Sequence, residues 1–140
     1  MTYKHWKYTK DNDNILWLTL DRADAKVNSL SDEVFDEFDK ALGEVAAANP
    51  VGVILQSGKT TGFIAGADIT QFTSLKDESE AFNLIRKAQL VLDKLAALPM
   101  PTLAIISGFC LGGGCETALA CTYRIAEDIP SRTKVTFPHI

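Results

Sequence analysis

Residues 102–116 have the sequence TLAIISGFCLGGGCE, in which an apolar run leads into three consecutive glycines. The apolar run, residues 102–106, predicts a buried strand, and the glycines predict the start of a helix that includes residues 117–120. The first N–H groups of a helix have no partner within the helix and lie at the positive end of its dipole. The stretch therefore predicts a site for an anion, or for an oxygen that becomes anionic in a transition state, with Glu116 about one turn into the helix.

Two other interpretations of the glycine run compete with an oxyanion site. A phosphate-binding loop would need the lysine of GxxxxGK[ST] or the glycine spacing of GxGxxG, and this stretch has neither. The other interpretation is purely structural: the glycines let a helix pack closely on a strand, and Glu116 is a solvated residue of the first helical turn. The glycine run alone leaves this second interpretation open.

The rest of the chain alternates between apolar strands and amphipathic helices. Further strands are predicted at residues 15–20, 51–55, 123–126 and 134–137. Ser31 is the expected cap of a first helix, in which apolar residues recur at helical spacing: Val34, Phe35, Phe38, Leu42 and Val45. A second helix is predicted to end before Pro99 and is marked by the spacing of Phe82, Ile85, Ala88, Leu92, Leu95 and Ala96. This alternation predicts the α/β class.

Composition and charge exclude several classes of protein. The chain has 140 residues, of which 46% are hydrophobic and 23% charged, with a formal net charge of −4. These values predict one globular domain or part of one. The sequence has no Lys/Arg-rich stripe, which argues against a nucleic-acid partner, and no apolar run reaches the roughly 18 residues of a membrane span. The N-terminus also lacks the apolar core of a signal peptide, so a cytoplasmic location is expected.

The three cysteines, Cys110, Cys115 and Cys121, are predicted to be free thiols. They are an odd number, form no CxxC pair and have no histidine at metal-ligand spacing. Neither a disulfide framework nor a metal site is therefore expected. Free cysteine is among the most buried residue types, so these thiols are predicted to be buried.

A second run of small residues follows the predicted strand at residues 51–55. Residues 62–69 have the sequence GFIAGADI, in which small side chains would expose backbone N–H groups. Two such loops, each at the carboxyl end of a strand, can each direct one N–H at a single carbonyl oxygen, which is the arrangement of an oxyanion hole. Asp68 is expected to cap the following helix rather than to act in catalysis.

Three segments in this order resemble the motifs of the crotonase (enoyl-CoA hydratase/isomerase) family: residues 23–30 (ADAKVNSL), 63–69 (FIAGADI) and 108–116 (GFCLGGGCE). The first segment is most similar to the N-terminal hydratase part of bacterial multifunctional fatty-acid oxidation alpha subunits. The resemblance implies an α/β crotonase-like spiral of repeated ββα turns. It also implies that residues 1–140 are the N-terminal part of such a domain, without the C-terminal helices that normally build a trimer or pack against a partner domain.

The same resemblance assigns roles to individual residues. Ala67 and Gly113 would donate the two backbone N–H groups of an oxyanion hole to the thioester carbonyl, and Glu116 would be a catalytic carboxylate. The residues expected to bind or flank the CoA thioester are Lys26, Val27, Ala65, Gly66, Asp68, Ile69 and Gly112. Lys26 would meet a phosphate group, although an exposed lysine in a loop is at least as often simply solvated.

The resemblance also implies the cofactors and partners. No metal and no cofactor are expected in this region, where the CoA thioester is the substrate, and NAD would be needed only if a dehydrogenase domain followed. The expected partners are the acyl-CoA substrate and further subunits, in a homotrimer or in a complex with a thiolase subunit.

One position departs from the family pattern. Hydratases of the family have a second glutamate directly after a proline, and the corresponding residues 136–139 are TFPH, with His139 at that position. Imidazole can donate or accept a proton near neutral pH, so His139 is expected to be the second catalytic group. Two alternatives stay open: Glu116 moves both protons, or His139 is a terminal residue without a role.

The expected activity is the addition of water to a 2-trans-enoyl-CoA in fatty-acid β-oxidation. One catalytic group would activate the water for attack on the β-carbon, the other would deliver a proton to the α-carbon, and the oxyanion hole would stabilise the enolate between the two steps. Two alternatives stay open: isomerisation or another enolate-forming reaction of an acyl-CoA, and acyl-CoA binding without turnover.

Overall fold

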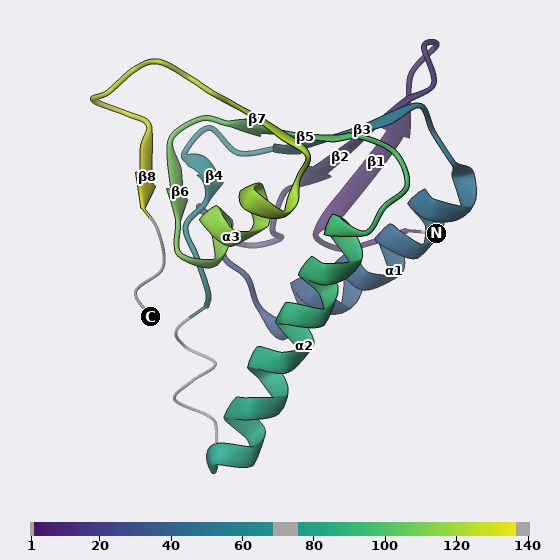
Figure 1. Ribbon diagram of the computed structural model, residues 1–140. Helices are drawn as coiled ribbons and strands as arrows, with labels where there is room; N and C mark the ends of the chain where they lie inside the picture. The colour runs from purple at the N-terminus through teal and green to yellow at the C-terminus, as the bar shows by residue number, and fades with distance from the viewer. Residues whose placement is uncertain (1, 69–75, 137–140) are drawn as a thin grey trace.

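The computed structural model describes residues 2–68 and 76–136, whose strands form two sheets (Figure 1). The larger sheet has the strand order β1-β2-β3-β5-β7. β1 (Trp6–Lys10) pairs antiparallel with β2 (Ile15–Leu20). The other strands of this sheet are β3 (Gly52–Ser57), β5 (Thr102–Ile106) and β7 (Tyr123–Ala126). The pairs β2–β3, β3–β5 and β5–β7 are all parallel. The strands predicted at residues 15–20, 51–55, 102–106 and 123–126 are therefore confirmed, as the parallel strands of this sheet.

A smaller parallel sheet consists of β4 (Gly62–Ile64), β6 (Phe109–Leu111) and β8 (Lys134–Thr136), in that order. Each of its strands follows a strand of the larger sheet along the chain: β4 follows β3, β6 follows β5 and β8 follows β7. The next described helices are α2 (Glu78–Ala96) after β4 and α3 (Gly113–Ala120) after β6. This repeated ββα order confirms the spiral that the motifs predicted.

The predicted first helix is α1 (Asp32–Ala48). Ser31 is its N-cap, because the Ser31 Oγ accepts a hydrogen bond from the Val34 N–H at 3.1 Å. Phe38 on its buried face stacks on Trp6 of β1, with ring centroids 4.3 Å apart. The complete buried face of the helix is Val34, Phe35, Phe38, Ala41, Leu42 and Val45. The five apolar residues that predicted the helix are thus all in the core.

The predicted second helix, α2, is packed only in part. Asp77 caps it, with its Oδ1 accepting a hydrogen bond from the Glu80 N–H at 2.9 Å. Val91 and Leu95, in the C-terminal half, are buried. Phe82 is 67% exposed, because the N-terminal half of α2 extends away from both sheets (Figure 1). The helical spacing of the apolar residues therefore predicted the helix correctly but not the burial of its first turns.

Two lysines of α2 form ion pairs with α1. Lys87 Nζ lies 2.7 Å from Asp32 Oδ1, and Lys94 Nζ lies 3.1 Å from Asp39 Oδ1.

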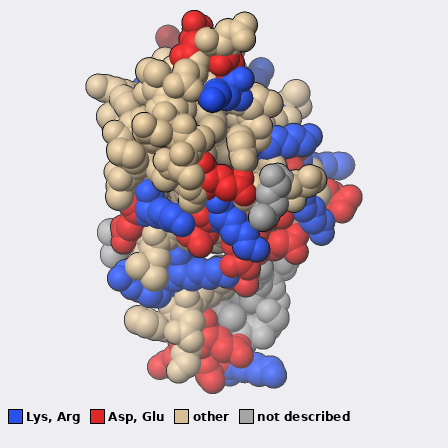
Figure 2. All heavy atoms as spheres, turned by 90° about the vertical axis from the view of Figure 1, so that its right-hand side faces the viewer, with Lys and Arg blue, Asp and Glu red and all other residues tan. Residues whose placement is uncertain are grey.

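On the face shown in Figure 2, basic and acidic side chains are interspersed, and they form no basic stripe of the kind that tracks a nucleic-acid backbone. Within residues 2–68 and 76–136, none of the helices combines the length and apolar character that crossing a bilayer requires.

The three cysteines are buried free thiols, as predicted. Burial raises the pKa of the Cys110 thiol to about 12 and that of the Cys121 thiol to about 11. Burial also raises the pKa of Cys115, which precedes Glu116 in α3. All three thiols are therefore protonated near neutral pH, a state in which cysteine is a poor nucleophile.

Candidate active site

The glycine run forms the N-terminus of α3. Gly112 is the N-cap, with a φ of 51° in the left-handed region that favours glycine. The Glu116 N–H donates to the Gly112 carbonyl at 3.0 Å and closes the first turn. Gly113 is the first helical residue, and its N–H has no acceptor among the described residues. A free backbone donor therefore lies at the positive end of α3.

Gly114 has a different role from Gly113, because it lets α3 lie directly against β4. A Cβ atom at Gly114 would be 2.3 Å from the carbonyl oxygen of Ile64, a distance that no side chain tolerates. The packing interpretation of the glycine run is therefore correct for Gly114. It is compatible with an oxyanion site, since the free donor belongs to the neighbouring glycine.

A second free donor belongs to Ala67, which follows β4 and forms a parallel bridge with Leu30. The Leu30 N–H donates to the Gly66 carbonyl at 2.8 Å, and the Asp68 N–H donates to the Leu30 carbonyl at 3.0 Å. Successive N–H groups of an extended chain point in opposite directions, so the Ala67 N–H points away from Leu30. β6 pairs with β4 on that side, and α3 follows β6. No acceptor for the Ala67 N–H is present in the described part of the chain.

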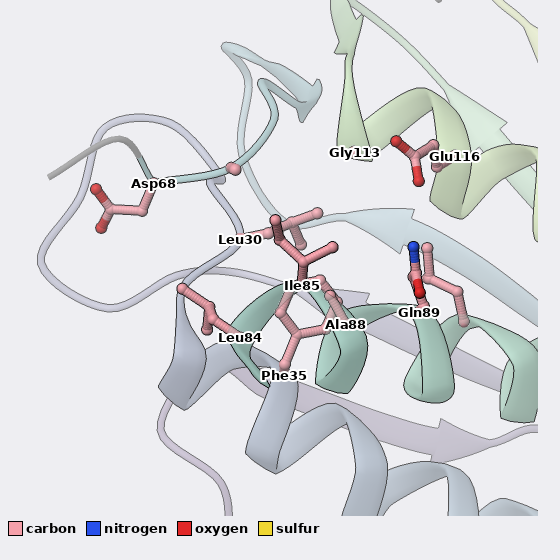
Figure 3. Close-up of a pocket in the computed structure, with 11 residues that line it drawn as sticks. Leu30, Phe35, Asp68, Leu84, Ile85, Ala88, Gln89, Gly113 and Glu116 are labelled. Carbon is pink, nitrogen blue, oxygen red and sulfur yellow. The ribbon is translucent and has the colours of Figure 1, made fainter. Parts of the chain in front are cut away.

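The two donors border one cleft of about 240 Å³ (Figure 3). Ala67, Gly113 and Glu116 all line this cleft. Most of the remaining wall is apolar and comes from Leu30, Phe35, Leu84, Ile85, Ala88 and Leu92. Residues of two distant motifs thus meet at a pocket that combines backbone donors, a carboxylate and an apolar wall.

The loop of residues 21–30 holds the chain that leads from β4 to the Ala67 donor. The buried carboxamide of Asn28 donates to the carbonyl oxygens of Leu20 and Phe63, at 2.9 and 3.0 Å. The Ala65 N–H in turn donates to the Asn28 carbonyl at 2.8 Å. The first motif of the sequence therefore supports the second motif through hydrogen bonds of its backbone and of one buried side chain.

An ion pair lies directly beside the Ala67 donor. Arg22 Nη2 is 2.8 Å from Asp68 Oδ2, and Arg22 Nη1 donates to Ser29 Oγ. The side chains of Arg22 and Asp68 are only 21% and 14% exposed. The Asp68 side chain points away from the other side chains that line the cleft (Figure 3). The first described helix after Asp68 is α2, which begins at Glu78 and is capped by Asp77, so the capping role expected of Asp68 stays a prediction.

Three further residues that were predicted to bind the CoA thioester are spread around the first two motifs. Val27 and Ala65 line a small hollow next to Asn28. Lys26 is exposed, and its carbonyl accepts a hydrogen bond from Thr61 Oγ1 at 2.7 Å. The structure thus brings Val27 and Ala65 together and leaves the Lys26 side chain at the surface.

Ile69 and His139 lie outside the described residues, so their predicted roles stay predictions. Among the predicted site residues, the structure brings Ala67, Asp68, Gly113 and Glu116 to one cleft. The cleft thus offers two hydrogen-bond donors for a carbonyl oxygen and one side chain that can transfer a proton.

One group of described side chains has the composition of a metal site: His5, Glu33 and Glu37. His5 Nε2 lies 2.6 Å from Glu33 Oε1, and His5 Nδ1 accepts a hydrogen bond from the Ala23 N–H at 3.0 Å. Both ring nitrogens thus have protein partners. The group ties the N-terminal segment to α1 and to the loop of residues 21–30.

The sequence prediction missed two residues at the site, Arg22 and Gln89. Arg22 directly precedes the motif of residues 23–30, and this cation next to the motif is the sequence feature from which its role could have been predicted. Gln89 lies one helical turn after Ile85 and lines the cleft with it. The signal for Gln89 was a polar residue within an apolar stripe.

Comparison with known proteins accounts for this arrangement of motifs. The family model described as enoyl-CoA hydratase/isomerase matches residues 10–139. The chain belongs to this family. Its crotonase-like α/β fold superposes on an enoyl-CoA hydratase from Bacillus anthracis with a TM-score of 0.80 at 29% sequence identity, covering 87% of this chain and 47% of that one. An enoyl-CoA hydratase/carnithine racemase from Magnetospirillum magneticum gives a TM-score of 0.82, also at 29% identity, covering 89% of this chain and 47% of that one.

The curated relatives of this crotonase chain are much longer proteins. The fatty acid oxidation complex subunit alpha of Aliivibrio fischeri is 40% identical over 135 residues, which are 95% of this chain and 20% of that protein. The subunit of the same name from Idiomarina loihiensis is 43% identical over 107 residues, or 75% of this chain and 15% of that protein. The similarity to fatty-acid oxidation alpha subunits is therefore confirmed, and the chain spans about a fifth of the length of its first curated relative.

In this crotonase fold, loss of the Arg22 cation is expected to destabilise the chain. Arg22→Met leaves the shielded carboxylate of Asp68 without its ion-pair partner and is expected to lower the free energy of unfolding by about 1–3 kcal/mol. Lys94→Met is the matched control, because its pair with Asp39 is largely exposed and should contribute less than about 1 kcal/mol. Urea unfolding of both variants measures the difference. Equal destabilisation by the two substitutions would contradict a structural role for the Arg22 pair.

Proposed function

We propose that the chain provides an enoyl-CoA hydratase site that adds water to a 2-trans-enoyl-CoA and yields the 3-hydroxyacyl-CoA. The observation that carries this proposal is the cleft in which Ala67, Gly113 and Glu116 meet. Two free N–H groups and a carboxylate around one pocket are the parts needed to form an enolate from a thioester.

The proposed reaction uses the two backbone donors for charge stabilisation. The thioester carbonyl oxygen accepts hydrogen bonds from the Ala67 and Gly113 N–H groups. As water oxygen bonds to the β-carbon, the electron pair of the double bond moves towards the thioester, and negative charge collects on its oxygen. The positive end of α3 adds to the stabilisation of that charge. Removal of one such donor typically costs about 10²–10³ in rate, so the pair would account for much of the catalysis.

Glu116 is the proposed proton-transfer group. Its carboxylate takes a proton from the attacking water, and a proton is delivered to the α-carbon to complete the addition. From the sequence resemblance, His139 is the proposed partner for the second proton. The apolar wall of the cleft suits the hydrocarbon part of the acyl chain, and the exposed Lys26 with Val27 and Ala65 is proposed to flank the CoA moiety.

The names of the relatives suggest the wider setting. We propose a role in fatty-acid β-oxidation in the cytoplasm, within a homotrimer or in a complex with a thiolase subunit. The relatives named as alpha subunits of a fatty acid oxidation complex support the second arrangement.

A second candidate is enoyl-CoA isomerisation, which needs the same oxyanion hole but only one proton shuttle. Among the described residues that line the cleft, the carboxylates are Glu116 and Asp68, and Asp68 is bound by Arg22. This observation leaves one carboxylate for proton transfer and is the reason to keep isomerisation as the alternative.

Substrate assays on the complete protein separate these functions. With a 2-trans-enoyl-CoA we expect the absorbance of the conjugated thioester to fall as the 3-hydroxyacyl-CoA forms. Conversion of a 3-enoyl-CoA without hydration of the 2-enoyl isomer would favour the isomerase. Tight binding of both thioesters with no conversion would contradict both enzymatic functions and indicate a binding scaffold.

A further inference from the structure

The cleft contains one polar side chain from α2, that of Gln89. The other α2 residues that line it are apolar: Leu84, Ile85, Ala88 and Leu92. Gln89 is exposed at the rim of the cleft, so its carboxamide can reach both solvent and a group that lies opposite it in the cleft.

The hydrogen bond from Arg86 sets the orientation of the Gln89 carboxamide. Arg86 Nη1 donates to Gln89 Oε1 at 3.2 Å. A guanidinium group can only donate hydrogen bonds, so the amide oxygen must face Arg86 and the NH₂ group must face the other way. In Figure 3 the Gln89 nitrogen is the end of the side chain directed towards Glu116.

Glu116 is the polar side chain that faces this NH₂ group across the cleft. Both residues line the same pocket, Glu116 from α3 and Gln89 from α2 (Figure 3). Asp68, the remaining charged residue of the wall, is bound by Arg22 and points elsewhere. Glu116 is exposed, and within the described residues no side chain donates a hydrogen bond to its carboxylate.

We propose that Gln89 is a positioning residue that donates its amide N–H to the Glu116 carboxylate, or to the water molecule that this carboxylate activates. This inference rests on the proposed hydratase function. A donor to the charged carboxylate favours its ionised form and fixes its direction, both of which a general base requires. The apolar neighbours of Gln89 on α2 strengthen that hydrogen bond once substrate excludes water from the cleft.

The first test compares two substitutions on α2 of the complete protein. Gln89→Leu is expected to lower kcat for 2-trans-enoyl-CoA hydration by about tenfold, the usual weight of a hydrogen bond to a charged group, with little change in KM. Asn83→Leu is the matched control, since Asn83 is an exposed amide of the same helix outside the cleft, and it should leave kcat unchanged. A kcat for Gln89→Leu within twofold of the control would overturn the inference.

The second test uses the pH dependence of kcat, which a merely structural role would not change. Gln89→Glu places a second negative charge opposite Glu116, and a like charge disfavours ionisation of its neighbour. The acidic limb of the kcat profile should therefore move to higher pH, by roughly one unit. An acidic limb that stays in place would contradict an interaction between residues 89 and 116.

A double variant separates failure of this inference from failure of the proposed function. If Gln89 acts through Glu116, then adding Gln89→Leu to Glu116→Gln should cause no further loss of kcat. An active wild-type protein in which the two losses multiply would overturn the role of Gln89 and leave the hydratase function in place. A wild-type protein that hydrates no enoyl-CoA would overturn both.

Discussion

Replacing Gly113 by proline is expected to lower kcat for enoyl-CoA hydration by about 10²–10³-fold while the chain stays folded. Proline at the first position of a helix is well tolerated, because its fixed φ suits the helix and the missing N–H has no intrahelical partner there. Gly113 holds that first position in α3, and its N–H has no acceptor among the described residues. The substitution therefore deletes one proposed oxyanion donor and nothing that the helix itself uses.

The matched control for this experiment is Gly113→Ala, which adds a Cβ atom but keeps the N–H. That Cβ would lie 3.1 Å from Leu30 Cδ1, and the end of a leucine side chain can move by the few tenths of an ångström required. Steady-state kinetics of both variants, with circular dichroism as the check on folding, measure the effect of the donor alone. Equal kcat values for the proline and alanine variants would contradict the oxyanion role of Gly113.

The parts of the fold that were predicted correctly are those with a strong periodic signal. β2, β3 and β5 lie inside the larger sheet, where their residues are buried or half-buried, and their sequences are largely apolar runs. β1 was missed because its sequence, WKYTK, alternates with charged residues at the edge of the larger sheet. β4 and β6 were missed because they have three residues each and lie beside glycines, which is typical of a turn.

The candidate site was predictable to the extent that it depends on local conformation. A free N–H at Gly113 follows from its place at the start of a helix. The direction of the Ala67 N–H depends on the bridge to Leu30, which is a contact between two loops and leaves no periodic trace in the sequence. That Gln89 and Glu116 line the same cleft depends on how α2 packs against α3, and helical spacing within α2 does not encode that packing.

Loss of the Glu116 carboxylate is expected to reduce the hydration rate most strongly of all the substitutions considered. Glu116→Gln keeps the size of the side chain but removes its ability to take a proton from water, and general acid–base groups typically contribute about 10²–10⁴ in rate. The backbone donors of Ala67 and Gly113 are unchanged in this variant. Its affinity for a saturated acyl-CoA should therefore stay close to that of the wild-type protein, whereas kcat falls.

Glu78→Gln provides the control that distinguishes catalysis from a simple helix-end effect. Glu78 and Glu116 are both exposed acidic residues of a first helical turn. A carboxylate there stabilises the helix by about 0.3–1 kcal/mol through its attraction to the positive end of the helix dipole. If Glu116 were only such a residue, both glutamine variants would lose a little stability and keep full activity. A large loss of kcat confined to Glu116→Gln, with acyl-CoA binding retained, would assign the proton-transfer step to Glu116, because the oxyanion hole and the fold would then be intact.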